Sequence, residues 1–454
     1  MATSLHRGFC IQSPVHIHHR LLLAALLVSI GAHDSAADPK RDVPDYDGRG
    51  NPDSDAGSWA LWIPRVVLSP LYLVNEFLLR RPIGALVTTA ERRRWANAVI
   101  DIFTFGPGGK STIVPTALFD FGLLPSVGVY LASDDFLADG NKIQFHAGTW
   151  GPDWINITAR DRYTWNAKRT SVGVRFDFKR QADLLFFGTG PDVTTATRAR
   201  YGLQRTETGG TFRQRLGGES SVEASSGVRM IGYRPGGCCN DPSLDSRIAD
   251  GTLERPDGYD TPYTSLYQHV ELTLDTRAPR PASSSGGYLQ MHAETNFDTR
   301  NDRSWVEYGA VFGVAADLHR QRTLRAQLAV DYVDPLDRSD VPFNELASLG
   351  GNLMPGFVSG WMLGRSVIAA QLGYTWPVWM WLDGQLRFSI GNAFDSHLAG
   401  LAGNKLRLSG DVGITTVGKR DQGFEILFGL GTETFEQGGG ITSVRLTFGS
   451  RKGF

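Results

Sequence analysis

Histidine, serine and cysteine could supply a nucleophile or a base, so their spacing is considered first. The chain carries no G-x-S-x-G motif, and no histidine stands at a recognisable strand spacing from a serine. The histidines beyond the N-terminal region are scattered along the chain: His146, His269, His292, His319 and His397. Because no nucleophile, base and orienting group converge, we expect no enzymatic activity.

Two adjacent cysteines and three aspartates share one polar segment, where redox or metal chemistry would need to be considered. Cys238 and Cys239 could form a vicinal disulfide or remain as two thiols, and both possibilities are open. The nearby Asp241, Asp245 and Asp250 lack the twelve-residue ligand pattern of a calcium loop. We therefore predict no metal and no cofactor, and interpret these aspartates as solvated loop charge.

From about residue 110 the hydrophobic period changes to two, which is the period of a β-strand. Apolar residues alternate with glycine, serine or charged residues at 172–178, 386–390 and 444–448. No layer of helices follows that could cover the apolar faces. The pattern therefore predicts an all-β fold, a transmembrane antiparallel β-barrel with lipid outside and a polar lumen. Residues 110–454 are long enough for about sixteen strands.

Glycine-rich turns and polar insertions fit this architecture. The chain has 53 glycines and 11% aromatic residues, a mixture typical of barrels with many turns and aromatic girdles. The two largest polar insertions run over about 232–262 and 333–360. Long loops of such barrels face the outside of the cell, whereas short turns face the periplasm.

The N-terminal part of the chain is expected to lie outside the barrel wall. Residues 1–37 predict a signal peptide, with positive charge, a short apolar run and small residues before the expected cleavage site. Residues 38–57, rich in Asp, Pro and Gly, predict a disordered linker. The formal net charge of −1 gives no basic excess for binding nucleic acid.

Residues 58–105 instead have helical periodicity. Ser69 and Pro70 have the residue types of a helix N-terminus, and Pro82 ends that helix. A second amphipathic stretch follows over about 83–102 and carries three consecutive arginines. Two interpretations stay open. The segment is either a periplasmic helical hairpin that caps the barrel or an interfacial helix that touches lipid.

Short motifs in the barrel region occur in a characteristic order. FGTGP at 187–191 and LDTR at 274–277 stand at expected strand ends, and 349–394 begins with a Gly-Gly loop entry and ends in a strand containing FSIGN. In this order they resemble the bacterial surface antigen family, which includes the barrels of the assembly factors BamA and TamA. The resemblance implies a barrel in the outer membrane of a Gram-negative bacterium that assembles or translocates other proteins.

The chain departs from the family pattern in the loop at 354–357. Pro355 stands where the family has an arginine, and Gly373 and Ser389 stand where the family has acidic residues that meet this arginine. All three charges are absent together, as expected if a lone buried charge is costly. The loop around Met354, Gly356 and Phe357 is therefore expected still to enter the lumen, held by packing.

Two further lumen positions lie on the strand of Ser389. Arg387 precedes Ser389 by two residues on the same strand face and could already hold the positive charge of this region, and Gly391 follows Ser389 on that face.

A second departure from the family pattern is that residues 38–109 leave no room for the POTRA domains of the family's assembly factors. The resemblance is to a short form without them.

The strands that close the barrel suggest one function. Pro115 lies in the first expected strand (111–119), where it removes a ladder donor, and Gly438, Gly439 and Gly440 precede the last strand. A weak seam between these strands would suit insertion or export of other proteins. Its partners would be outer-membrane lipid, unfolded outer-membrane proteins or a periplasmic partner. The alternative is a structural or passive barrel with an ordinary closed seam and no insertase activity.

Overall fold

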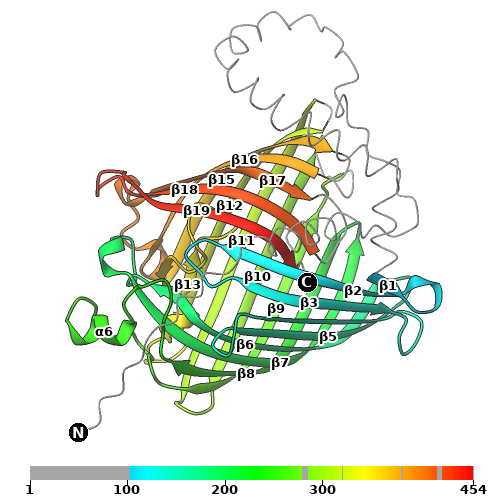
Figure 1. The fold of residues 1–454 in the computed structure, drawn as a ribbon, viewed down its shortest axis with the longest axis horizontal. Coiled ribbons are helices and arrows are strands. Elements are labelled where there is room, and N and C mark those ends of the chain that lie inside the picture. Colours follow the sequence, from blue (N-terminus) through cyan, green and yellow to red (C-terminus); the bar gives the residue numbers. More distant parts are fainter. Residues whose placement is uncertain (1–102, 279–284, 320, 380–381, 417–421, 453–454) are drawn as a thin grey trace, which may run out of the picture.

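The computed structural model describes residues 103–278, 285–319, 321–379, 382–416 and 422–452, which form one large β-barrel (Figure 1). The predicted signal peptide (1–37), the predicted linker (38–57) and nearly all of the predicted helical segment (58–105) lie outside the described residues. The end of that segment is described, and there Thr104–Phe105 form the short strand β1. Among the described residues, no helix is long and apolar enough to cross a membrane.

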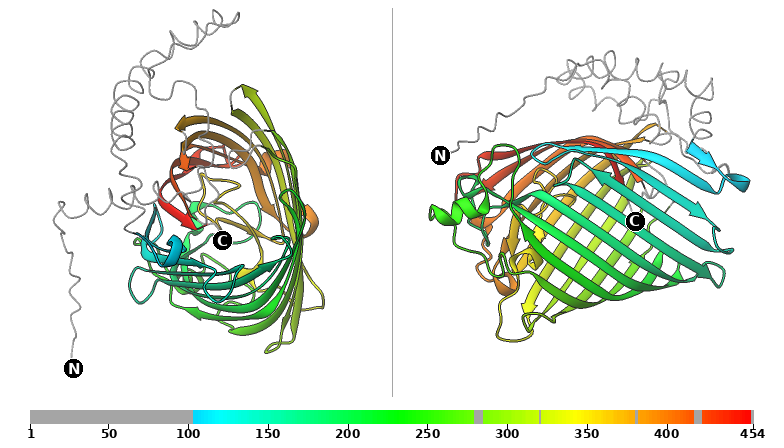
Figure 2. Two further views of the ribbon diagram at one scale, coloured as in Figure 1. Left: turned by 90° about the vertical axis from the view of Figure 1, so that its right-hand side faces the viewer. Right: turned by 60° about the horizontal axis from the view of Figure 1, so that its bottom comes forward.

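Sixteen antiparallel strands in the described part of the chain form a closed wall, and the first and last of them, β2 and β19, pair to complete the ring (Figures 1 and 2). In chain order they are β2 (Ser111–Asp120), β3 (Ser126–Asp134), β4 (Asn141–Thr149), β5 (Ile155–Trp165), β6 (Thr170–Phe186), β7 (Ala199–Gly217), β8 (Ser220–Arg234), β9 (Tyr263–Asp275), β10 (Gly286–Asp298), β11 (Arg303–His319), β12 (Arg322–Pro335), β15 (Ser366–Trp379), β16 (Leu382–Phe394), β17 (Arg407–Thr416), β18 (Gln422–Thr434) and β19 (Ile441–Lys452). The predicted antiparallel barrel of about sixteen strands is confirmed, and the expected first strand (111–119) is β2.

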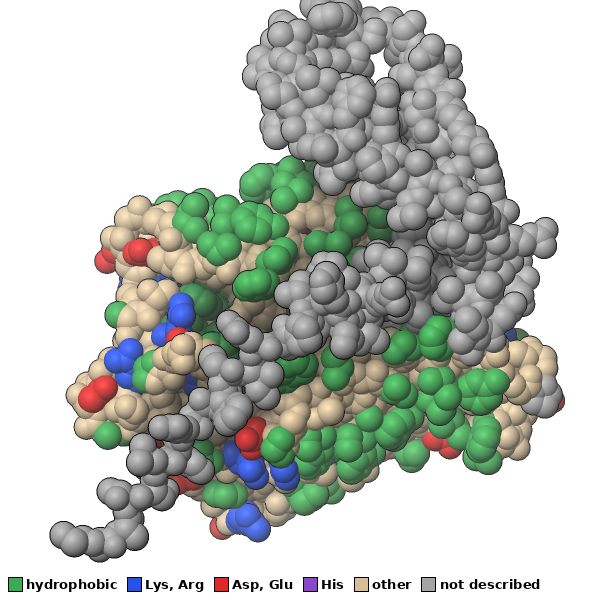
Figure 3. Space-filling view, in the orientation of Figure 1, with side chains coloured by type: hydrophobic (Ala, Val, Ile, Leu, Met, Phe, Trp, Pro, Cys, Tyr) green, Lys and Arg blue, Asp and Glu red, His purple; other side chains and the backbone are tan. Residues whose placement is uncertain are grey.

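The alternation of side chains decides which residues face outward. On β6, Val172, Val174 and Phe176 are exposed on the outer wall, whereas Asp177 is buried and points inward. Apolar side chains cover much of the visible outer wall in Figure 3. In a soluble protein this pattern would bury the apolar face, so an exposed apolar face on a closed sheet indicates contact with lipid.

The two ends of the barrel differ in the length of their connections. At the end that we call the loop end, residues 235–262 join β8 to β9 and contain the helix α6 (Leu244–Ala249). Residues 336–365 join β12 to β15 at the same end and contain the short strands β13 (Ala347–Leu349) and β14 (Met362–Gly364). These are the two long insertions expected from the sequence. The opposite end, which we call the turn end, has connections of ten residues or fewer.

The apolar core lies inside the barrel, toward the loop end. Residues 336–365 fold back into the ring of strands (Figure 2). Met354 and Phe357 are completely buried there, and they pack in one cluster with Trp305 and Val333 from the wall. The lumen of this barrel is therefore filled at its loop end and is not an open pore along its whole length.

Candidate functional site: the seam and the inward loop

The seam between the first and last strands is the shortest pairing of the barrel wall. β19 pairs with β2 over three residues, with Thr447 opposite Asp120, Phe448 opposite Phe119 and Gly449 opposite Leu118. Every other adjacent pair of strands in the described wall is in register over eight residues or more. Backbone hydrogen bonds hold barrel strands together, so opening the described wall at the seam breaks the shortest ladder of such bonds.

The edge of β2 that faces β19 is divided into three parts. Its start is covered by β1, because Thr104 and Phe105 pair with Thr112 and Ser111 of β2. The same two residues of β2 pair with β3 on their other side. Its end pairs with β19. In the described part of the chain, residues 113–117 between these two contacts have no register partner on β19, and Pro115 lies in their middle without an N–H to donate.

Glycines shape the same region. Gly449 has a φ of 147°, and a Cβ on it would overlap the carbonyl oxygen of Ala117, so the two strands approach closely where they pair. Gly438, Gly439 and Gly440 lie in the turn before β19, and the first two have positive φ. The structure therefore places these three glycines at the loop end of the last strand, away from its contact with β2.

An ion pair crosses the seam inside the lumen. Arg445 on β19 donates from Nε and Nη2 to the two carboxylate oxygens of Asp120 on β2, at 2.8 and 2.5 Å. The side chains are 6% and 10% exposed. A two-point guanidinium–carboxylate contact is among the stronger polar contacts in proteins, so side chains reinforce the short backbone ladder.

Residues 350–361 form a loop inside the lumen, which we call the inward loop. Its tip is held by the last three strands. The amide N–H of Gly356 donates to Ser409 Oγ on β17 at 2.7 Å, and Ser443 Oγ on β19 donates to the carbonyl oxygen of Gly356 at 2.6 Å. Nη1 of Arg445 donates to the carbonyl oxygens of Pro355 and Phe357, at 3.3 and 3.2 Å. The expectation that packing holds this loop instead of charge is therefore wrong in part, because the Arg445 guanidinium also binds its tip.

Glycines let the tip of the inward loop lie directly on the wall. A Cβ on Gly356 would overlap the carbonyl oxygen of Leu430 on β18. A Cβ on Gly431 would lie 2.5 Å from the ring of Phe357, and one on Gly429 would lie 2.9 Å from the carbonyl oxygen of Pro355. Larger residues at these positions would lift the tip off the strands.

The predicted lumen-strand positions lie beside this loop. Ser389 Oγ accepts a hydrogen bond from Gln371 Nε2, which also donates to the carbonyl oxygens of residues 352 and 353 in the inward loop. Arg387 makes a two-point ion pair with Asp411 on β17, both contacts at 2.9 Å. Gly373 stands opposite Arg387 on β15, and Gly391 is packed tightly against the backbone of β15. Gln371, Gly373 and Arg387 line a cavity of about 520 Å³ under the loop.

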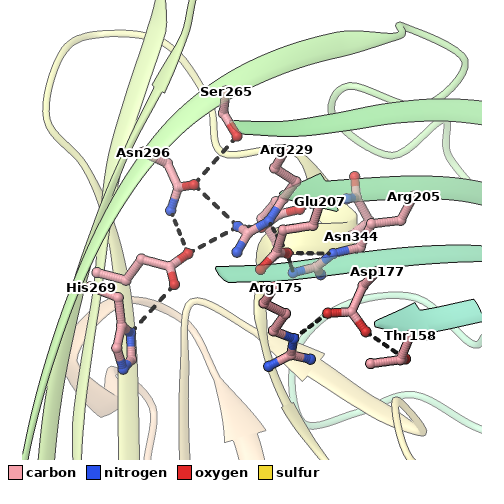
Figure 4. Close-up of polar contacts among 12 residues, drawn as sticks. Thr158, Arg175, Asp177, Arg205, Glu207, Arg229, Ser265, His269, Asn296 and Asn344 are labelled. Carbon is pink, nitrogen blue, oxygen red and sulfur yellow. Dashed lines mark hydrogen bonds and ion pairs between the residues drawn. The ribbon is translucent and has the colours of Figure 1, made fainter. Parts of the chain in front are cut away.

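A second polar network joins the wall to the segment before the inward loop (Figure 4). Arg229 on β8 contacts the carboxylates of Glu207 at 3.1 Å, Glu294 at 2.9 Å and Glu345 at 3.0 Å. Glu345 also accepts a hydrogen bond from Tyr263 at 2.6 Å. Glu207 also pairs with Arg205 and Glu294 also contacts His269, so Arg229 is not the single partner of these carboxylates, and the network holds Glu345 against the wall.

Sequence reasoning missed Arg445, Asp120, Asp411 and the Arg229 network. Each of these residues lies at an inward position of an alternating strand, which was a signal that they face the lumen. What the alternation does not reveal is which inward residues meet. Asp120 and Arg445 are 325 residues apart, and Arg229 and Glu345 are 116 apart.

The cysteines and aspartates singled out from the sequence lie in the 235–262 connection at the loop end. Cys238 and Cys239 are joined by a disulfide. Asp241 accepts a hydrogen bond from Arg200 at 2.8 Å, and Asp245 accepts one from Tyr259 at 2.9 Å. Burial, together with this contact, raises the pKa of the Tyr259 hydroxyl. The two aspartates are thus engaged in holding the connection, and no metal-binding cluster occurs among the described residues.

Comparison with known proteins rests on structure alone. No protein-family model and no curated protein matches this sequence. The barrel superposes on that of BamA from Haemophilus ducreyi lacking POTRA domains 1–3, with a TM-score of 0.55 and 12% identity, over 75% of this chain and 70% of that one. The chain has the barrel fold of BamA. The fold implied by the sequence motifs is therefore confirmed.

A second solved structure is similar over a smaller part of its length. CdiB from Acinetobacter baumannii matches with a TM-score of 0.47 and 10% identity, over 75% of this chain and 59% of CdiB.

Proposed function

We propose that this protein is an outer-membrane barrel that assembles or translocates other polypeptides by opening the seam between β2 and β19. The observation that carries the proposal is the three-residue pairing of these strands beside residues 113–117 of β2, which have no register partner on β19 in the described chain. An unpaired strand edge is a template on which another extended chain can add its own hydrogen bonds.

Location in the outer membrane is part of the proposal. The described wall exposes large apolar side chains on many strands, among them Val174, Phe312, Phe388 and Val444. A strand-built wall with an apolar outside suits the outer membrane, where barrels have this pattern. We expect the mature protein to fractionate with outer membrane and to migrate faster on a detergent gel when it is not boiled.

The alternative is a structural or passive barrel without insertase activity, and the filled lumen argues against one form of it, an open pore. The inward loop and its cluster, which includes Phe357, Trp361 and Met362, occupy the loop end of the barrel. Solutes could not diffuse straight through such a lumen. An opening at the seam needs no clear channel along the barrel axis.

The test is to close the seam with a disulfide. Phe119 and Phe448 are register partners on the outer wall, and Phe428 and Leu446 are partners on the long β18–β19 ladder. In a chain with Cys10, Cys238 and Cys239 replaced by serine, Phe119→Cys with Phe448→Cys locks the seam. Phe428→Cys with Leu446→Cys is the matched control, since it bridges strands that are already paired along their length.

Each form is reconstituted into liposomes, and a urea-unfolded outer-membrane protein is added. We expect the reduced proteins and the oxidised control to speed the appearance of protease-protected, heat-modifiable product, and the oxidised seam variant to lose this effect until it is reduced. The proposal is wrong if the oxidised seam variant works as well as its reduced form, or if the protein never exceeds empty liposomes.

A further inference from the structure

The guanidinium of Arg445 is shared between two parts of the molecule that must move differently if the seam opens. Nε and Nη2 face Asp120 on the first strand, and Nη1 faces the carbonyl oxygens of Pro355 and Phe357 in the inward loop. A guanidinium is a rigid planar fork with five donors. It cannot follow one of these partners without turning away from the other.

The tip of the inward loop is otherwise hydrogen-bonded to the last-strand side of the seam. Its tip contacts Ser409 on β17 and Ser443 on β19 through Gly356, and rests on β18 through glycine. Arg445 extends this set of contacts to Asp120 on the opposite side. The loop carbonyls orient the fork, and the oriented fork meets the Asp120 carboxylate at two points.

Separation of the strands would leave both charges without a charged partner. Asp120 would lose Arg445 and also Thr447 Oγ1, which lies 3.4 Å away on the same strand β19. Arg445 would keep only neutral carbonyl acceptors at a site where its side chain is 6% exposed. A lone buried guanidinium is costly, so it would turn toward water and release the carbonyls of the loop tip.

Resting on the opening proposed above, we infer that Arg445 is a positioning residue that couples the inward loop to the seam. When Asp120 leaves Arg445, the loop tip loosens from the lumen wall. When the loop tip is displaced, the fork loses its orientation and the seam loses its bridge. The coupling runs from the backbone carbonyls of the loop, through one side chain of the last strand, to a carboxylate on the first strand.

The chain offers a matched control on the same row of the wall. Arg387 and Asp411 form an equivalent two-point ion pair on neighbouring strands, and Asp411 is the register partner of Gly429, which in turn pairs with Arg445. The hydrogen bonds described for the Arg387 guanidinium go to the Asp411 carboxylate and not to the inward loop. Breaking it removes a similar charge pair without touching the proposed coupling.

The experiment measures how fast a cysteine in the loop tip reacts while the change is made on the first strand. The full chain, with Cys10, Cys238 and Cys239 replaced by serine, carries Met354→Cys, which replaces a completely buried side chain. Its rate of reaction with a maleimide is compared in the parent, in Asp120→Asn and in Asp411→Asn. A second reporter, Ala329→Cys on β12, is 2% exposed in the parent structure and reports general unfolding.

We expect Asp120→Asn to raise the rate of labelling at position 354 by about tenfold. An increase of this size corresponds to the loss of one hydrogen bond to a charged group. Asp411→Asn should leave it unchanged, and the reporter at 329 should stay slow in both. An unchanged rate at 354 in Asp120→Asn overturns the inference, because Arg445 would then bridge the seam without positioning the loop.

If Asp120→Asn also exposes position 329, Arg445→Lys decides the matter, because lysine keeps a cation for Asp120 but not the fork. Faster labelling at 354 alone supports the coupling, and an unchanged rate at 354 overturns it. Labelling needs no polypeptide substrate. Failure of the coupling is therefore distinguishable from failure of the proposed function, which is read from the disulfide-locked seam.

Discussion

Arg445 and Asp120 form a two-point ion pair across the closure of the barrel, although 325 residues separate them in sequence. The pair lies inside the lumen. Asp120 is also the register partner of Thr447, which follows Arg445 by two residues on β19. With three residues of backbone pairing at this closure, the ion pair is a large share of what joins the first strand to the last.

The losses of stability on removing the two charges of this pair should not be additive. Asp120→Ala or Arg445→Ala should each cost about 3–5 kcal/mol of unfolding free energy, because the remaining charge stays buried without a partner. The double variant should cost less than the sum of the two. Urea unfolding in detergent, followed by tryptophan fluorescence, measures this cycle.

The exposed pair of Lys110 and Asp135, 2.8 Å apart, provides the comparison. Removing either partner there should change stability little, since exposed ion pairs are weak. If the losses at positions 120 and 445 were simply additive, the two side chains would not be acting on each other.

A methyl group at Gly431 should displace the inward loop. A Cβ there would lie 2.5 Å from the Phe357 ring, so Gly431→Ala should cost about 1–3 kcal/mol through overpacking. Gly232→Ala on β8 is the control, because a Cβ at that position meets nothing within 4 Å. Phe357→Leu should recover part of the loss in Gly431→Ala. Equal heat-modifiability midpoints for the two glycine variants would show that the loop does not rest on β18.

The effects on stability of charged residues introduced at positions 355 and 389 should depend on each other. Pro355→Arg should lower the heat-modifiability midpoint, because its cation would enter a buried site where the Pro355 carbonyl already accepts from Arg445. Ser389→Asp alone should not stabilise, since the nearby Arg387 is already paired with Asp411. The double variant should regain stability through a new ion pair. A double variant no better than the sum of the singles would mean that these positions do not face each other.

The Asp337 carboxylate should stabilise the connection after β12 in a pH-dependent way. Hydrogen bonds from Ser339, and then from Ser304, lower its pKa to about 2. A depressed pKa in the folded protein contributes stability above the ordinary aspartate pKa and loses it as pH falls toward the depressed value. The midpoint difference between parent and Asp337→Asn should therefore be present at neutral pH and vanish near pH 2. A difference that persists unchanged at pH 2 would contradict this role of the carboxylate.

The position of the inward loop was predictable in part. Pro355 together with Gly373 and Ser389 indicated a loop without the family's charge cluster, and the structure brings Ser389 to the loop through Gln371. The charge that contacts the loop instead comes from Arg445. Its distance from the loop in sequence, and the fact that it binds backbone carbonyls, left no residue pattern from which to infer the contact.

The sequence by itself determined the class of fold. A strand fixes its own period, so alternation in segments such as 172–178 shows that one face is apolar and the other polar, and long polar stretches show where the wall is interrupted. The expected first strand and the two long connections followed from this local information.

The tertiary structure decided which inward residues meet, and how weakly the ring closes. Pairing between β2 and β19 depends on the tilt and stagger accumulated around all the strands, and a shift of one residue would turn Asp120 away from the lumen. No local sequence pattern encodes the tilt and stagger accumulated around the ring. The contact of Arg445 with Asp120 and with the inward loop exists because ring closure, strand register and loop entry are satisfied together.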